Sequence, residues 1–273
     1  RIILLLLKGI GDTVYGLSWV DAYKKKYPEK KITLIGNKHY EKIINAYHVD
    51  RCFFYYSDEE YSMYKSLLNS RRLSKRAMLN DIYNTDPYFL CTVQKSLHGK
   101  SVPQLLKEII YKVDSEEMSL PLDLNCEIKS IDGFYDKAKK IIIVNPYSNS
   151  IVSSHSEYEE IISIINNAGY TAYVNLRPGQ DKIKGGIDLY CTLEELYTIA
   201  KYAAGIISVR SGILDLLAGT RIPMLVLYQN CTGKFRNLYS MEYWNRKVST
   251  REINIDSMKQ QELRENVINW IND

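Results

Sequence analysis

Two segments that lie far apart in the sequence restrict the possible folds of this chain more than any other feature. Residues 1–13 read RIILLLLKGIGDT, and residues 205–215 read GIISVRSGILD. Each is an apolar run that breaks into glycine and small or charged residues, and a helical pattern follows. This is typical of a buried parallel strand that leads through a tight turn into a helix N-terminus. Because ligands bind at the carboxyl ends of strands in open α/β sheets, we expect two nucleotide-binding-type domains that face a shared cleft.

The first half of the sequence alternates predicted strands and helices. Strands are expected over 2–7, 31–36 and 51–56, and helices over 13–26 and 40–47. The first helix ends in three lysines before Tyr27 and Pro28, as helix C-termini often do. This order predicts a parallel sheet with right-handed crossovers. Beyond it we expect a basic helical stretch over 58–84, a strand over 88–93 and a helix over 102–112.

The second half restarts the alternation after an aperiodic connection over 114–136. Strands are expected over 141–144, 171–176, 187–190, 205–209 and 223–228, and helices over 156–168, 193–203, 212–218 and 257–270. Thr192 is predicted to cap one of these helices, with Glu195 completing a capping box. The pattern therefore predicts two domains, residues 1–136 and residues 137–273.

Composition excludes several classes of function. The 273 residues are 45% hydrophobic and 25% charged, which is typical of a globular protein. The net charge of +4 is too mild for a nucleic-acid-binding stripe, so no nucleic acid partner is expected. The five cysteines form no CxxC pair and the four histidines share no ligand spacing, so we expect no disulfide framework, metal or cofactor.

The sequence also indicates a location. The opening run over 2–7 is far shorter than the ~20 residues that cross a bilayer, and the glycines and Asp12 behind it are unlike a signal sequence. We therefore expect a cytoplasmic protein. The basic stretch from Lys65 to Arg76 is typical of a solvated helix face. Alternatively, it steers a phosphorylated or lipid-linked acceptor, or makes peripheral contact with the anionic inner face of the cell membrane.

Three segments of the second half carry a family resemblance: TLEELYTIA at 192–200, IISVRSGILDLLA at 206–218 and IPMLVLY at 222–228. They resemble the donor half of the bacterial ADP-heptose:lipopolysaccharide heptosyltransferases and their relatives. The first half, with Gly11-Asp12 after the opening strand and Tyr27-Pro28 after the first helix, is similar to the acceptor half. The resemblance implies an α/β GT-B fold, in which two Rossmann-like domains with parallel sheets face a central cleft.

The same resemblance implies an activity. Members of the family transfer a sugar from a nucleoside-diphosphate sugar, with inversion and without a metal, to a glycan or lipid-linked acceptor. The pathway it implies is bacterial cell-surface polysaccharide synthesis, of lipopolysaccharide or capsule. The family's catalytic acidic residue follows the first-loop glycine, and Asp12 holds that position here.

The first loop provides the candidate base. A carboxylate at a strand end can accept the proton of an acceptor hydroxyl, and Asp12 is placed to do so. The alternative is that Asp12 caps the following helix with its side chain. Lys8 and the backbone at Gly11 are candidates for contact with an anionic group of either substrate, although Lys8 also fits a solvent-facing strand end. The glycine spacing misses GxGxxG because Val14 occupies the third position, which disfavours an NAD-dependent enzyme.

The second loop provides the candidate diphosphate site. Gly212 permits close backbone approach at a helix N-terminus, Ser211 offers a hydroxyl, and Arg210 can bind two oxygens at once. Such a group stabilises a leaving diphosphate as its charge develops. Relatives usually carry an acidic residue and a histidine where this chain has Arg210 and Asp215, and we expect Arg210 to supply the positive charge. The alternative is an Arg210–Asp215 ion pair that holds the loop.

Other candidate donor contacts follow the remaining strands of the second half: Asn145, Tyr147, Ser148, Arg177 and Glu194. Small polar residues at such turns are also ordinary turn chemistry. Arg177 could approach the base or ribose or be merely exposed. Glu194 matches the family's helix-start Glu, where a ribose diol could be hydrogen-bonded, or it only complements the helix dipole.

Two further functions fit the same plan. A nucleotide-sugar epimerase would convert its substrate with no acceptor present. A non-catalytic sugar-nucleotide-binding protein would retain every measurable property after Asp12→Asn.

Overall fold

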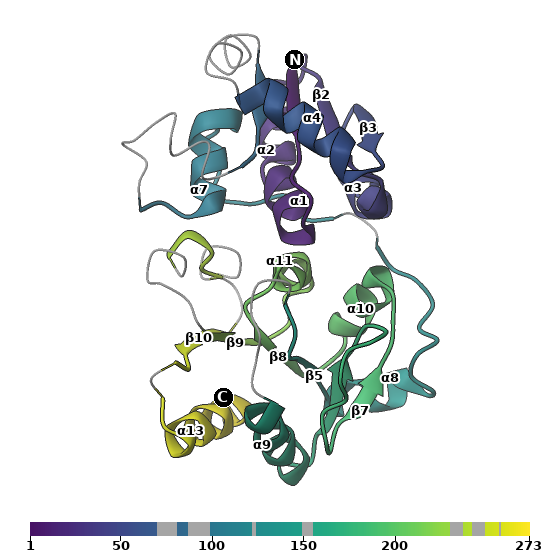
Figure 1. Cartoon of the computed structure of the whole chain (residues 1–273), viewed down its shortest axis with the longest axis vertical. Helices are drawn as coiled ribbons and strands as arrows, with labels where there is room; N and C mark the ends of the chain where they lie inside the picture. The colour runs from purple at the N-terminus through teal and green to yellow at the C-terminus, as the bar shows by residue number, and fades with distance from the viewer. Residues whose placement is uncertain are drawn as a thin grey trace. The chain divides into compact units, whose positions relative to one another are not determined.

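The computed structural model describes residues 1–69, 81–86, 99–121, 124–148, 155–229, 237–241, 249–256 and 258–273 (Figure 1). The chain divides into two compact units. The N-terminal unit comprises Arg1–Leu124 and Asn237–Tyr239, and the C-terminal unit comprises Asn125–Arg236 and Ser240–Asp273. The division falls earlier in the chain than the boundary predicted after residue 136.

A four-stranded parallel sheet forms the centre of the N-terminal unit. Its strands are β1 (Ile2–Leu5), β2 (Ile32–Asn37), β3 (Arg51–Tyr55) and β4 (Ile82–Asn84), in the order β3-β2-β1-β4. The central strands are apolar because both faces are covered, and Leu4 and Leu34 are completely buried. The helices are α1 (Ile10–Leu17), α2 (Val20–Lys26), α3 (Glu41–Asn45), α4 (Asp58–Asn69) and α7 (Val102–Leu106).

The predicted helix over 13–26 is in fact two helices. The chain breaks at Ser18 and Trp19, where the Ser18 hydroxyl donates to the carbonyl of Tyr15 over 2.6 Å. The indole of Trp19 is buried and donates to the carbonyl of Pro103 over 2.8 Å. This long-range contact outweighs the local helical pattern, because a buried indole N–H needs a partner.

Other expectations in this unit also changed. The stretch over 58–84 is not helical throughout, since its end forms β4 alongside β1. The helix over 102–112 changes at Lys107–Tyr111 to π-helical geometry and ends at Lys112, which has φ +51°. The strand expected over 88–93 lies outside the described residues.

A six-stranded parallel sheet forms the centre of the C-terminal unit. Its strands are β5 (Ile141–Asn145), β6 (Thr171–Asn175), β7 (Ile187–Leu189), β8 (Gly205–Val209), β9 (Met224–Tyr228) and β10 (Thr250–Asn254). Their order is β10-β9-β8-β5-β6-β7, so the order reverses between β5 and β8, as in a Rossmann sheet. The edge strand β10 was not predicted from the sequence. Its side chains except Ile253 are only half-buried, so it lacks the apolar run of the central strands.

The helices of this unit are α8 (Phe134–Lys137), α9 (His155–Asn167), α10 (Leu193–Ala200), α11 (Gly212–Leu217) and α13 (Gln260–Asn272). Figure 1 shows α9 and α13 next to each other, and they share one apolar core that includes Ile161 and Trp270. The Trp270 ring packs directly on β8, because a Cβ on Gly205 would lie only 2.5 Å from it. A side chain at Gly205 would therefore displace α13.

The residues after Leu124 belong to the C-terminal unit because α10 holds them. The Glu195 carboxylate accepts hydrogen bonds of 2.7 Å from the backbone N–H groups of both Lys129 and Ser130. The N–H of Cys126 donates to the Thr198 hydroxyl over 3.1 Å. As predicted, Thr192 caps α10 through its hydroxyl, which accepts from the N–H of Glu195. These bonds explain why the division precedes residue 136.

Glu195 makes this attachment pH-dependent. Burial opposes ionisation, but the N–H groups of Ser130, Lys129 and Thr192 outweigh it and lower the pKa of Glu195 below its ordinary 4.5. A lowered carboxyl pKa stabilises the fold above the unfolded-state pKa, and this stabilisation is lost as the pH falls through the folded-state value. We therefore expect Glu195→Gln to cost about 1–2 kcal/mol at pH 7.

Thermal unfolding of wild type and Glu195→Gln between pH 3 and pH 7 measures this effect. The difference between the two proteins should be full at neutral pH and shrink below pH 4.5. A difference that does not vary with pH would show that the charge of Glu195 does not hold the segment.

Candidate functional site

The strand order of the C-terminal unit determines where a ligand site can form. Crossover connections leave β5 and β8 on opposite sides of the sheet, which opens a crevice at their carboxyl ends. Asn145 ends β5 and pairs in register with Ser208 of β8. Buried polar side chains at this point of an otherwise apolar sheet indicate a ligand site more strongly than any other feature described in this unit.

A hydrogen-bonded network fixes Asn145 at this edge. Its amide nitrogen donates to the hydroxyl oxygens of Ser208 at 2.9 Å and Ser211 at 3.3 Å. Its amide oxygen accepts from the side chain of Asn175, at the end of β6, over 2.9 Å. Asn145 is only 2% exposed, so these bonds satisfy a buried amide and hold the β8–α11 turn against β5.

Sequence reasoning missed Asn175 and Ser208. The available signal was a polar residue at or near the carboxyl end of an apolar strand, which both residues share with Asn145. Their register across the sheet could not be inferred without the strand order.

Arg210 and Asp215 form a buried ion pair beside this network. One terminal nitrogen of Arg210 lies 2.7 Å from Oδ1 of Asp215, and their side chains are only 4% and 2% exposed. The other terminal nitrogen donates to the carbonyl of Ser211. The structure thus contains the arrangement that the sequence left as the alternative for Arg210. Contact between Arg210 and a diphosphate stays a prediction.

The remaining predicted donor contacts lie in turns at the same sheet edge. The hydroxyl of Tyr147 donates to the carbonyl of Asp181 over 2.8 Å, and burial raises the pKa of Tyr147, with the charge of Asp181 adding to it. Ser148 is half-buried next to it. Arg177 is exposed in the turn after β6, and Glu194 is half-buried in the first turn of α10. The contacts assemble Asn145, Tyr147 and Ser211, with Gly212 next in the chain.

In the N-terminal unit, Asp12 lies in the first turn of α1. The helix begins at Ile10 with Gly9 as its N-cap, so the alternative in which Asp12 is the N-cap is wrong. The carboxylate folds back over Gly9, because a Cβ there would lie 2.7 Å from Oδ2 of Asp12. Gly11 is buried in the same turn. Asp12 is therefore held at the carboxyl end of β1.

Aromatic side chains surround this end of β1. The rings of Tyr55 and Tyr61 lie 5.3 Å apart, and both pack against Leu5. Burial raises the pKa of both phenols, and the charge of Asp12 adds to the effect. Asp12 is thus close enough to influence both rings.

Lys8 lies beside the same aromatic cluster. Its ammonium is 2.7 Å from Oδ1 of Asp58 and 5.1 Å from the centre of the Tyr61 ring. Lys65 approaches the same ring at 5.9 Å and pairs with Asp86. Lys8 thus has two specific contacts, although its side chain is 40% exposed, so the solvent-facing alternative stays open. Its contact with substrate stays a prediction.

Within the described ranges, no three His, Cys, Asp or Glu side chains come together as metal ligands would. None of the helices resolved there has both the length and the apolarity needed to cross a bilayer.

Two Rossmann-like units, each with polar side chains at the carboxyl edge of a parallel sheet, define a GT-B-like α/β protein. The chain is similar over its whole length to E. coli heptosyltransferase WaaC with ADP, at 10% identity and a TM-score of 0.64, covering 99% of that chain. It is similar to E. coli ADP-heptose lps heptosyltransferase II at 11% identity and a TM-score of 0.62, covering 100% of this chain and 98% of that one.

A third likeness is to a glycosyl transferase family 9 protein from Veillonella parvula, at 12% identity and a TM-score of 0.58, covering 93% of this chain and 85% of that one. The sequence matches no protein-family model and no curated protein. The likenesses confirm the predicted heptosyltransferase-like fold. The shared cleft between the two sheets stays a prediction.

Proposed function

We propose that this protein is a glycosyltransferase that transfers a sugar from a nucleoside-diphosphate sugar to a glycan or lipid-linked acceptor. The observation that carries the proposal is the polar network of Asn145, Ser208 and Ser211 at the switch point between β5 and β8. This is where Rossmann sheets bind nucleotides. The whole-length likeness to a heptosyltransferase with ADP supports a nucleotide ligand.

The donor binds, in this proposal, at the carboxyl edge of the C-terminal sheet. Asn145 is held in one orientation, so the hydroxyl of Ser211 and the backbone at Gly212 have fixed positions. Tyr147, Ser148, Arg177 and Glu194 lie in adjacent turns and contribute to binding of the base and ribose. Fixed polar groups that meet a departing diphosphate stabilise its developing charge without reorganisation.

Asp12 is the proposed general base. An acceptor hydroxyl that reaches the end of β1 gives its proton to the Asp12 carboxylate as its oxygen attacks the anomeric carbon. The bond from that carbon to the diphosphate breaks at the same time, which inverts the configuration. Lys8 and the backbone at Gly11 would orient an anionic group of a substrate. We propose no metal or cofactor for this reaction.

Arg210 acts on the donor site through the turn that it orders. Its charge is already balanced by Asp215, and its guanidinium also binds the Ser211 carbonyl. We therefore propose that Arg210 and Asp215 position Ser211 and Gly212, rather than that Arg210 provides an unpaired charge for the diphosphate.

The acceptor is proposed to be a glycan or lipid-linked saccharide of bacterial cell-surface polysaccharide synthesis. Met63 and Leu67 are one turn apart on α4, and both are about half exposed, at 54% and 52%. Exposed apolar residues on a helix surface support peripheral contact with a lipid or a membrane, and we propose that the enzyme is cytoplasmic.

Product analysis tests the proposal and separates it from its alternatives. Purified protein is incubated with ADP-, UDP- and GDP-sugars, with and without extracted lipid-linked acceptors, and the products are analysed by mass spectrometry. Transfer that requires an acceptor supports a glycosyltransferase. Conversion without acceptor would establish an epimerase, and tight binding with no conversion would establish a binding protein.

Gly9→Ala tests whether the position of Asp12 matters. The backbone at Gly9 has φ −79° and ψ 154°, which alanine adopts easily, but its Cβ would displace the Asp12 carboxylate. We expect the free energy of unfolding to change by less than about 1 kcal/mol. Turnover should fall roughly 10- to 100-fold, because small displacements of catalytic groups are costly. Steady-state kinetics and thermal unfolding of the same preparation measure both effects. Unchanged turnover would show that catalysis does not depend on the position of Asp12.

A further inference from the structure

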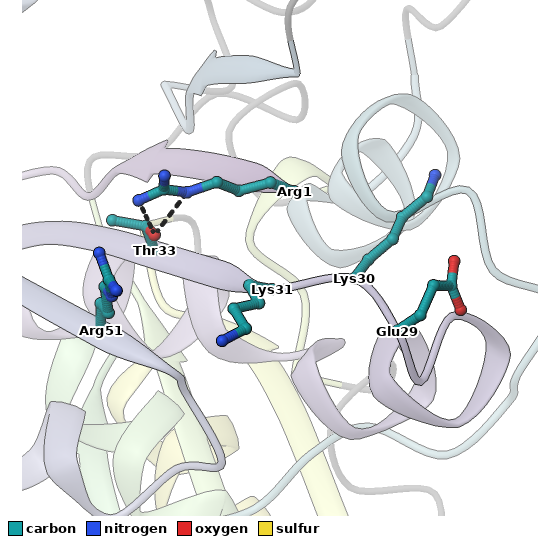
Figure 2. Close-up of a pocket in the computed structure, with 6 residues that line it drawn as sticks. All are labelled: Arg1, Glu29, Lys30, Lys31, Thr33 and Arg51. Atoms are coloured by element: carbon teal, nitrogen blue, oxygen red, sulfur yellow. Dashed lines mark hydrogen bonds between the residues drawn. The ribbon is translucent and has the colours of Figure 1, made fainter.

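Four cationic side chains line one hollow at the amino edge of the N-terminal sheet (Figure 2). The hollow has a volume of about 250 Å³ and is lined by Arg1, Glu29, Lys30, Lys31, Thr33 and Arg51. These residues lie at or near the first residues of β1, β2 and β3. Because the strands are parallel, this cationic hollow is at the opposite end of the sheet from Asp12.

Arg1 and Arg51 both lie next to Thr33. Nε and Nη2 of Arg1 both donate to the Thr33 hydroxyl, over 3.2 Å and 3.0 Å. Thr33 pairs in register with Arg51 on β3, and side chains of such a pair point to the same face of the sheet. Figure 2 shows the side chains of Arg1 and Arg51 next to Thr33. The fold therefore brings two like charges together.

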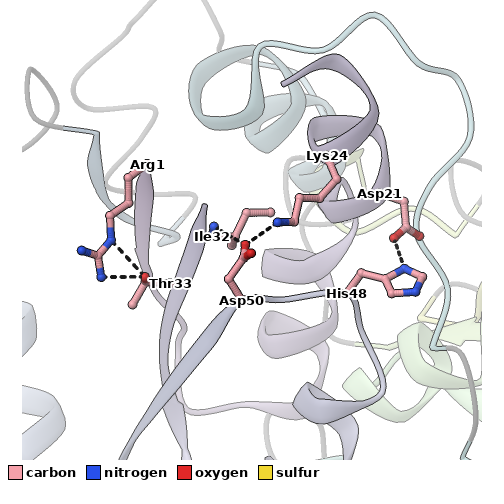
Figure 3. A network of polar contacts seen from close by, with 7 residues as sticks. All are labelled: Arg1, Asp21, Lys24, Ile32, Thr33, His48 and Asp50. Carbon is pink, nitrogen blue, oxygen red and sulfur yellow. Dashed lines mark hydrogen bonds and ion pairs between the residues drawn. The ribbon is translucent and has the colours of Figure 1, made fainter. Parts of the chain in front are cut away.

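Two other carboxylates of this unit already have partners. Asp50 precedes Arg51, but its carboxylate accepts from the backbone N–H of Ile32 over 2.8 Å and pairs with Lys24 (Figure 3). Burial opposes ionisation of Asp50, yet Lys24 and Ile32, with a smaller effect of Lys31, lower its pKa. Asp21 pairs with His48 instead. Among the lining residues, Glu29 alone is acidic.

We propose that the cationic hollow binds a phosphate group, carried by a soluble phosphate ester or by the headgroup of an anionic phospholipid. The planar guanidinium of arginine binds phosphate oxygens in pairs, and two arginines beside one hydroxyl suit a phosphate anion. Bound phosphate would offset the repulsion between Arg1 and Arg51. The site is separate from the proposed donor and acceptor contacts and does not depend on the proposed function.

Two probes distinguish the sources of the phosphate. Glycerol 3-phosphate is titrated by calorimetry, with acetate as the comparison anion, and phosphatidylglycerol vesicles are compared with phosphatidylcholine vesicles by co-sedimentation. Saturable binding of glycerol 3-phosphate indicates a soluble ester, and binding to phosphatidylglycerol vesicles alone indicates a headgroup. The absence of both would overturn the proposal.

Matched variants distinguish binding in the cationic hollow from non-specific attraction to positive charge. We expect Arg1→Gln with Arg51→Gln to weaken binding roughly tenfold or more, as loss of hydrogen bonds to a charged group does. Lys139→Gln with Lys140→Gln removes the same charge from exposed positions of the C-terminal unit and should change binding less than twofold. Equal losses in both variants would also overturn the proposal. Arg51→Gln alone preserves the Arg1–Thr33 bonds and serves if the double variant is unstable.

Discussion

Asp12→Asn should lower the turnover number for sugar transfer by about 10²- to 10⁴-fold, the contribution typical of a general base. The asparagine has the shape of the aspartate, so it keeps the first turn of α1 and the contact with Gly9. It cannot accept the acceptor proton, however. Donor affinity should stay within a few-fold of wild type, because the proposed donor contacts come from the C-terminal unit. Steady-state kinetics, donor titration and thermal unfolding give the three values.

Asp114→Asn is the matched control. Its side chain is 93% exposed and pairs with Lys26 on the surface, where ion pairs contribute little. This variant should keep wild-type turnover. If Asp12→Asn also kept turnover within threefold of wild type, Asp12 would not be the base.

Asp215→Ala should be among the most destabilising single substitutions in the chain. It removes the carboxylate that lies 2.7 Å from the guanidinium of Arg210, and loss of one partner of such a buried ion pair typically costs about 3–5 kcal/mol. For a unit of this size that corresponds to a fall in melting temperature of roughly 6 to 20 °C. Donor affinity should fall as well, because the turn that presents Ser211 and Gly212 loses its support. Calorimetric unfolding and donor titration measure the two effects.

A double variant separates the support of the turn from direct contact with the donor. Arg210→Met with Asp215→Leu replaces the pair by apolar side chains of similar volume, a change that is often neutral. Stability should largely return, and donor affinity should recover to within about threefold of wild type if the pair only positions the turn. Restored stability with donor affinity still tenfold weaker or worse would show that Arg210 contacts the diphosphate directly.

Much of the fold could be predicted because buried parallel strands are continuous apolar runs. The runs that begin at Ile2, Ile141 and Gly205 each form a strand almost where the pattern indicates. The prediction from sequence pattern was wrong where tertiary contacts determine the secondary structure. The predicted helix is interrupted where the Trp19 indole donates to the carbonyl of Pro103. The strand β4 forms because it pairs with β1, which is far from it in the sequence.

The candidate site was predicted less completely, for a related reason. Asn145 and Ser211 were found because each follows an apolar run. Asn175 and Ser208 join them only through the strand order, which the sequence does not contain locally. The partner of Arg210 was named correctly as the alternative, but only the structure shows that both side chains are buried. Burial depends on the packing around α11, and spacing alone does not determine it.

Hydrogen exchange measured by mass spectrometry, with and without saturating ADP, UDP or GDP, tests whether the carboxyl edge of the C-terminal sheet binds the donor nucleotide. We expect one of these nucleotides to slow amide exchange at the carboxyl ends of β5, β6 and β8 and in the first residues of α11, around Asn145, Asn175 and Ser211. Protection confined to other parts of the chain, or no protection by any of the three nucleotides, would contradict this expectation.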